Sequence, residues 1–397
     1  MKKQNKTYAL AMLMGLYWMA CITMFGYATV LLLHWGYNGS QIGIITAIAC
    51  IVTAMLQPGI STLAGASKRY SMVDILTVLG IAFMVLAVLL LVLPKSFWLT
   101  AILFTATYIV NSCMTPLINS CGFAYEAAGI YMNFGLGRGT ASLTFGLIST
   151  AMGYVVAKFG TESVLVVSIF MMILTLLVLR AFFPHVALGT LYIESKQQTE
   201  TEEPAKNEPF FKKYPVLLVV FTGMALVAMG ATFTGNYSIM IIENVGGNAA
   251  TQGMMLAIAA YLEIPAMFSF VWAVKKFGAS NVLKLAAVFH TAKSVLMMLA
   301  GNVTMIYIAQ LTCLLGQGLF IPVAVEFPKS STDPADQVKS QGIYGSFAMI
   351  SSVIASLLGG LIVDGFGVTA LTITASTVGV IGCIIIFLFA RDRKQAK

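Results

Sequence analysis

Charged residues are scarce in this chain of 397 residues. Asp, Glu, Lys and Arg together make up only 10% of it, whereas hydrophobic residues make up 59%. A typical soluble domain has about 25% charged residues. The composition therefore excludes an ordinary soluble protein and favours a chain that is surrounded by lipid.

The sequence also lacks the motifs that carry enzyme chemistry. Its six cysteines form no CxxC pair, and only three histidines are present. We find no cluster of metal ligands, no phosphate-binding loop and no nucleophile elbow. We therefore expect no enzymatic activity, no cofactor and no metal site.

Long apolar runs fill most of the chain instead. Each is about 18–29 residues long, which is enough to cross a hydrocarbon core of about 30 Å as a helix. Helices are expected because lipid cannot satisfy free backbone N–H and C=O groups. We predict an all-α membrane protein with twelve spans, at 8–33, 41–63, 73–93, 98–121, 138–158, 163–184, 214–242, 250–274, 279–300, 303–325, 342–364 and 367–390.

Lysine and arginine are unevenly distributed among the expected loops. Seventeen of them fall on one side of the membrane and two, Lys95 and Lys158, on the other. Loops rich in these residues stay in the cytoplasm, so we expect an inner-membrane protein with both termini in the cytoplasm. This topology also explains the net charge of +8, and we expect no nucleic-acid partner.

Similar sequences recur on either side of the middle of the chain. "GIITAIA" (43–49) resembles "GMMLAIA" (253–259) at an offset of 210 residues. A second set of matches has an offset of 207: Gly135, Gly153, Val156, Phe159 and Gly160 with Gly342, Gly360, Val363, Phe366 and Gly367. Two sets with nearly equal offsets indicate an internal duplication.

The long polar stretch at 185–213 separates the two copies and is expected to be a cytoplasmic linker. The predicted domains are therefore 1–184 and 214–397, with six spans each. Two parallel halves are the arrangement of major facilitator transporters, which bind their substrates between the halves near the middle of the membrane. We expect such a protein to act as a monomer.

Four segments resemble the major facilitator superfamily, and most closely its oligosaccharide–proton symporter branch, the lactose-permease group. They are "LQPGISTLAG" (56–65), "YEAAGIYMNFGLGRGTASLTFG" (125–146), "YLEIPAMF" (261–268) and "HTAKSVLMM" (290–298). The resemblance implies alternating-access transport of a sugar or glycoside coupled to protons. It also implies a charge pair between Glu126 and Arg138.

The chain departs from that branch at positions that matter for its activity. Thr140 stands where the family has a sugar-contacting arginine. The tenth span of the family carries a His and a Glu that are central to proton coupling. Here the corresponding stretch, "AQLTCLLGQGLFIPV" (309–323), contains Cys313 and Gln317 but no acid and no imidazole.

Glu263 is the strongest candidate for a functional residue. A charged side chain at the centre of a span costs about 2.5–3.5 kcal/mol on insertion scales, so it usually faces a cavity or a partner. At the helical rise, Glu263 lies about 17 Å and Lys293 about 21 Å from the inner ends of their spans. We expect them to interact, either as a structural ion pair or as a binding site for solute or proton.

Several other residues are weaker candidates. Arg138 is placed near the inner end of its span, where it either pairs with Glu126 or extends to the interface. His290 is the only histidine in the middle of a span and is a candidate proton carrier or a packing residue. Further polar residues either line a cavity or hold helices together: Asn236, Tyr237, Thr140 and Gln317.

The leading hypothesis is a secondary transporter of a small polar solute, with H+ as the coupling ion. An exporter of drugs or metabolites is the main alternative, since the 23 methionines suit a lipophilic cavity. A non-transporting membrane sensor is an alternative of another class. The linker is too short for the soluble domain that a sensor usually has.

Overall fold

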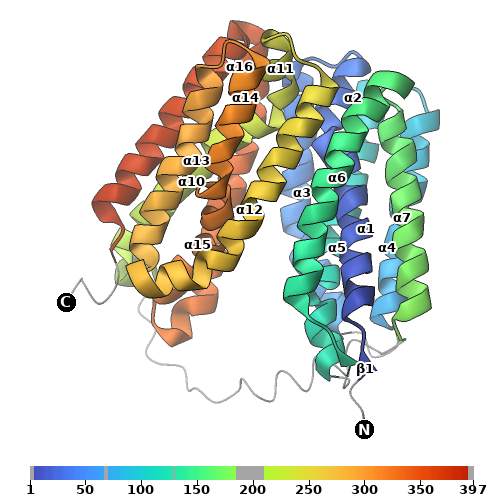
Figure 1. Ribbon diagram of the computed structural model, residues 1–397, viewed down its shortest axis with the longest axis horizontal. Coiled ribbons are helices and arrows are strands. Elements are labelled where there is room, and N and C mark those ends of the chain that lie inside the picture. Colours follow the sequence, from blue (N-terminus) through green and yellow to red (C-terminus); the bar gives the residue numbers. More distant parts are fainter. Residues whose placement is uncertain (1–3, 67–69, 128–129, 185–209, 392–397) are drawn as a thin grey trace. The chain divides into compact units, whose positions relative to one another are not determined.

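The computed structural model describes residues 4–66, 70–127, 130–184 and 210–391, and they are almost entirely helical (Figure 1). The only strands in these ranges are β1 (Gln4–Asn5) and β2 (Ile130–Tyr131), which pair in parallel. Most of the expected linker, at 185–209, lies outside the described residues.

The chain forms two compact units, 1–37 with 48–201 and 38–47 with 202–397. The helices up to residue 182 are α1 (Thr7–Cys21), η1 (Ile22–Gly26), α2 (Ala28–His34), α3 (Gly39–Ala66), α4 (Met72–Val92), α5 (Phe97–Ala127), α6 (Phe134–Phe159) and α7 (Ser163–Phe182). The beginning of α3 groups with the second unit, and its remainder groups with the first.

The second unit contains the remaining helices (Figure 1). They are α9 (Phe210–Lys213), α10 (Pro215–Asn236), α11 (Ser238–Asn244), α12 (Ala249–Phe277), α13 (Ala279–Met298), α14 (Val303–Gln310), η2 (Leu311–Leu314), α15 (Gln317–Ser330), η3 (Pro334–Asp336) and α16 (Gln337–Phe389). The fold is that of the expected all-α membrane protein.

Ten helical stretches of the described residues are long and apolar enough to span a membrane. One of them lies in α16, which contains two spans because Gly367 interrupts it with a φ of 83°. Helix α13 is not among the ten, since Lys284, His290 and Lys293 lower its hydropathy, yet its 20 residues are long enough to cross. When α16 is counted as two spans and α13 is added, the described residues contain the twelve expected spans.

The internal duplication is visible as matching local structure in the two units. Tyr27 donates a hydrogen bond to the carbonyl oxygen of Ser149, and Tyr237 donates one to that of Ser356. The two tyrosines are 210 residues apart and the two serines 207, the same offsets as in the sequence. Positive-φ glycines repeat at the same offsets: Gly36 with Gly246, and Gly160 with Gly367.

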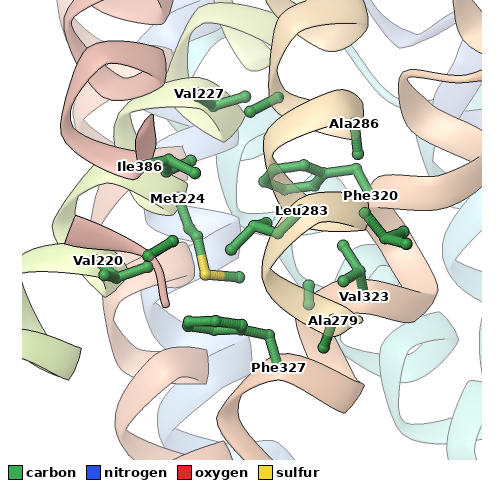
Figure 2. Close-up of a cluster of buried hydrophobic side chains, with 14 of the residues drawn as sticks. Val220, Met224, Val227, Ala279, Leu283, Ala286, Phe320, Val323, Phe327 and Ile386 are labelled. Carbon is green, nitrogen blue, oxygen red and sulfur yellow. The ribbon is translucent and has the colours of Figure 1, made fainter. Parts of the chain in front are cut away.

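A tightly packed apolar cluster holds α10, α13, α15 and the end of α16 together (Figure 2). Met224 and Leu283 are fully buried at its centre, and Phe327 packs beside them. Small residues such as Ala286 let the helix backbones approach. In lipid such an association depends on close packing rather than on the hydrophobic effect, so this cluster fixes the helices that surround the candidate site.

The beginning of α3 is capped by α16. Asn38 and Gln41 each accept a hydrogen bond from the backbone N–H of the other. The carboxylate of Asp364 accepts bonds from the N–H groups of Gly39 and Ser40 at 2.9 and 2.7 Å. The N–H groups that have no partner within a helix at its first turn are thus satisfied here.

Candidate functional site

The two charged residues that the sequence singles out lie near a common neighbour. Glu263 is half-buried on α12, and Lys293 is half-buried on α13. Both lie close to Cys313, which is buried in η2. Three helical elements of the second unit therefore bring a carboxylate, an ammonium group and a thiol into one region.

Glycine makes this close arrangement possible. A Cβ atom at Gly318, on α15, would lie 3.2 Å from the Cα atom of Glu263 and 2.7 Å from the Cβ atom of Ala266. Only glycine lets α15 pack so closely against α12 at the level of Glu263. The backbone of the tenth span is thereby held directly beside the carboxylate.

The tenth span is broken at this point, which the sequence did not lead us to expect. Helix α14 ends at Gln310, the tight η2 turn follows, and α15 starts only at Gln317. Gly316, between the two, has a non-helical backbone with φ −77° and ψ −94°. Broken helices occur in transporters where the backbone is buried in protein or lines a cavity.

Proline adds further irregularity next to the break. Pro265 lies inside α12, two residues after Glu263, and Pro322 lies inside α15. A proline inside a helix removes one backbone N–H, so the carbonyl group four residues earlier loses its helical partner. These carbonyl groups belong to Tyr261 and Gly318, which flank the site. Backbone oxygen atoms thus add acceptors to a region whose sequence has few polar side chains.

His290 lies beside the break, on α13. Its ring stacks on Phe320 with the ring planes 2° apart and the centroids separated by 4.9 Å. It is 8% exposed, and its Nδ1 atom is buried without a hydrogen-bond partner. A Cβ atom at Gly316 would lie 2.8 Å from the backbone nitrogen of His290, so the break packs directly against this turn of α13.

Two glutamines flank the break in the tenth span. Gln317 is half-buried in the first turn of α15. Gln310 is fully buried at the end of α14, and its Nε2 atom donates to the carbonyl oxygen of Ile306. The thiol of Cys313 lies 3.8 Å from the Oε1 atom of Gln310. The tenth span therefore presents amide, thiol and backbone groups in place of an acid and an imidazole.

Arg138 belongs to the first unit and is half-buried near the beginning of α6. Its guanidinium group lies over the ring of Trp18, 5.1 Å from the centroid, and donates to the Oγ atom of Ser142 at 3.1 Å. Glu126 falls in the last turn of α5, but its side chain lies outside the described residues. The charge pair between them stays a prediction.

The remaining candidates engage groups of the protein itself. The hydroxyl group of Thr140 donates to the carbonyl oxygen of Leu136 in its own helix. Asn236 donates a hydrogen bond to the Oγ atom of Ser356. Tyr237 is fully buried, and its hydroxyl group donates to the carbonyl oxygen of Ser356. The contacts of Asn236 and Tyr237 join the end of α10 to α16, whereas the bond of Thr140 stays within α6.

The geometry brings Glu263, Lys293, His290 and Gln317 to neighbouring turns of α12, α13 and α15. It also adds Cys313, which the sequence analysis did not single out as a candidate site residue. The signal that pointed to it was its place in a tenth span with two nearby glycines, Gly316 and Gly318. Such a set of groups can accept and donate hydrogen bonds, and it can hold a proton or an ion, but it contains no activated nucleophile.

Comparisons with known proteins agree with this architecture. Residues 8–374 match the profile of the MFS_1 like family. The maltose permease of Geobacillus stearothermophilus is 23% identical over 366 residues, covering 90% of this chain and 88% of the permease.

Solved structures are similar across nearly the whole chain. The nucleoside transporter NupG has a TM-score of 0.78 at 13% identity, covering 96% of this chain and 98% of its own. A mutant of a peptide transporter, POT, in complex with alafosfalin has a TM-score of 0.70 at 12% identity, with coverage of 97% and 93%. At these identities the likeness concerns the fold.

Proposed function

The chain belongs to the MFS_1 like family of major facilitator transporters, and we propose that it carries a small polar solute, a sugar or glycoside, in symport with protons. The proposal places solute and proton at Glu263 and its neighbours. The observation that carries it is the convergence of Glu263 and Lys293 on Cys313 beside the broken tenth span.

The chemistry of the site suits a hydroxyl-rich solute. An ionised carboxylate offers only acceptors, and an ammonium group offers only donors, so together they can bind both sides of a sugar hydroxyl. Amide and backbone groups beside the break add neutral partners. A purely lipophilic cargo would offer these polar groups no hydrogen bonds in exchange for those that they lose when the cargo displaces water.

Protons are proposed as the coupling ion because Glu263 is an acid placed in the middle of a span. A proton or ligand shifts the equilibrium between inward and outward states only by its differential affinity for them. Protonation of Glu263 and its interaction with Lys293 would supply that difference. His290, buried against Phe320, is the next proton-binding group that the site offers.

The proposal includes the expected arrangement in the membrane. The halves 1–184 and 214–397 would each contribute six spans, with 185–213 and both termini in the cytoplasm. The distribution of lysine and arginine among the loops supports this orientation. We further propose that the protein works as a monomer in the inner membrane.

Transport by the Glu263→Gln variant tests the proposal. Uptake of radiolabelled maltose, lactose and a wider saccharide panel would be measured in vesicles, with and without an imposed pH gradient. Glutamine is neutral and nearly isosteric, so the variant should insert normally, yet uptake should fall by about tenfold or more, the effect of losing about 1.4 kcal/mol of binding. Glu162→Gln makes the same change at an exposed residue before α7 and should transport like the wild type.

Three results would contradict the proposal. Wild-type uptake by Glu263→Gln would show that the residue is structural. Accumulation driven by a sodium gradient alone would remove the proton from the mechanism. Efflux of lipophilic cations, with no saccharide transported, would favour an exporter instead.

A further inference from the structure

A cavity lies away from the candidate site, in the second unit where α10 begins and α16 ends. Its volume is about 450 Å³, within the range of small-molecule sites. It is bordered by the first turns of α10, the end of α15, and the end of α16 with Arg391, which follows it. Neither Glu263 nor any other residue of the candidate site lines it.

The lining of this cavity separates into a polar end and an apolar wall. Lys213, Tyr214 and Arg391 lie outside the apolar ends of the helices and supply two cations and a phenol. Leu217, Val220 and Phe389 supply the wall. Val220 also belongs to the packed cluster of Figure 2, so the wall rests on a rigid support.

The polar end has a local network that fixes one of its cations. The Nζ atom of Lys213 lies 2.7 Å from the Oδ2 atom of Asp336 and 3.0 Å from that of Asp333. Tyr214 donates to the same two carboxylates. Arg391 approaches the cavity from the other side, at the end of the last span, and is exposed.

The surrounding sequence is rich in positive charge. The described residues 210–214, 326–340 and 391 contain five lysine and arginine residues against three acidic ones. Basic clusters directly after a span attract anionic lipids, and each Lys or Arg near the membrane surface contributes measurably to that attraction. A ligand that suits this cavity therefore has an anionic head and an apolar tail.

The exposure of the apolar wall indicates that such a ligand comes from the bilayer. Phe389 is 42% exposed and Leu388 is 61% exposed, so the wall of the cavity reaches the surface at the end of α16. A residue so placed at the end of a span faces the bilayer. A lipid can therefore enter the cavity laterally without passing through the protein.

We propose that this cavity binds an anionic phospholipid of the bilayer, with its phosphate at Arg391 and an acyl chain along Leu217, Val220 and Phe389. The site is independent of the transport function proposed above. With the orientation proposed there, the lipid belongs to the cytoplasmic leaflet.

Native mass spectrometry of the delipidated full-length protein in detergent tests the site. Phosphatidylglycerol, phosphatidylcholine and glycerol 1-phosphate would be titrated in turn. Phosphatidylglycerol should bind, and Arg391→Gln should raise its Kd about fivefold, the effect of one cation near the surface. Phe389→Ala should also weaken binding, because it shortens the wall at an exposed position where folding is not at risk.

Arg180→Gln is the matched control, since Arg180 is an exposed arginine in the last turn of α7. Its Kd for phosphatidylglycerol should equal that of the wild type. Equal losses in Arg180→Gln and Arg391→Gln would overturn the proposal in favour of unspecific attraction. Equal affinity for phosphatidylcholine, or for glycerol 1-phosphate without acyl chains, would overturn it as well.

Discussion

A methyl group added at Gly360 would occupy space that the backbone of α3 already fills. An ideal Cβ atom at this position overlaps the carbonyl oxygen of Gly39 and lies 2.8 Å from the Cα atom of Ser40. Ordinary contacts are at about 3.5–4.0 Å between carbon atoms, so Gly360→Ala should force α16 and the beginning of α3 about 1 Å apart or more. Backbone atoms, unlike the end of a flexible side chain, cannot turn away.

Two effects of Gly360→Ala lower the free energy of unfolding, and one effect raises it. Overpacking of a closely packed contact costs about 1–3 kcal/mol. The separation also stretches the bonds from Gly39 and Ser40 to Asp364, and loss of an N-terminal cap costs about 0.5–2 kcal/mol. Alanine gains back about 1 kcal/mol over glycine in helix propensity. Gly360→Ala should therefore destabilise the protein by about 0.5–4 kcal/mol.

Gly365→Ala provides the control, because it lies further along α16 and has no atom within 4 Å of its ideal Cβ position. It should leave the stability unchanged or raise it by up to about 1 kcal/mol. Thermal denaturation of the purified variants in detergent gives the comparison. A Gly360→Ala protein that melts at or above the temperature of Gly365→Ala would refute the close contact.

Three further predictions concern particular hydrogen bonds and charges. Glu263→Gln should abolish accumulation driven by a pH gradient, and surviving downhill exchange should not vary with pH between about 5.5 and 8; persistent pH-driven accumulation would move the proton elsewhere. Tyr27→Phe and Tyr237→Phe should each lose about 0.5–1.5 kcal/mol of stability in thermal denaturation, by similar amounts, because each removes the equivalent hydrogen bond to a carbonyl group. The hydrogen bond from Lys213 lowers the pKa of Asp336, so its stabilising effect should be complete above about pH 4 and lost at lower pH, as hydrogen exchange at 210–214 would reveal.

Much of the architecture could be predicted because lipid restricts the backbone so strongly. A chain with so few charges must form spanning helices, and the length of each apolar run sets its boundaries to within a few residues. Local capping follows the sequence too, since the side chain of Asn133 accepts a hydrogen bond from the N–H of Leu136 at the beginning of α6. The duplication was visible because equivalent turns need the same glycines, such as Gly160 and Gly367.

The broken tenth span was not predicted, for a physical reason. Its residues are apolar, and the sequence places glycines at 316 and 318 but no polar cluster that would mark a turn. Hydropathy averaged over a window of residues indicates whether a segment lies in lipid or in water, but it does not indicate the backbone conformation of that segment. Only the packing of Gly316 against α13 and of Gly318 against α12 shows why the backbone leaves the helix there.

The break shows that the tenth span can be polar even though it has no acidic side chain and no imidazole. A continuous apolar helix hides its backbone groups, so its polarity comes from side chains alone. A helix that ends and restarts inside the span releases N–H and C=O groups at both ends. In this chain the stretch from Leu311 to Gly316 can therefore be polar without a charged residue. Glu263 would then supply the charged group of the site, and the backbone of the tenth span would supply neutral hydrogen-bonding groups beside it. The ionisable side chains of the tenth span alone therefore underestimate its capacity to bind a polar solute.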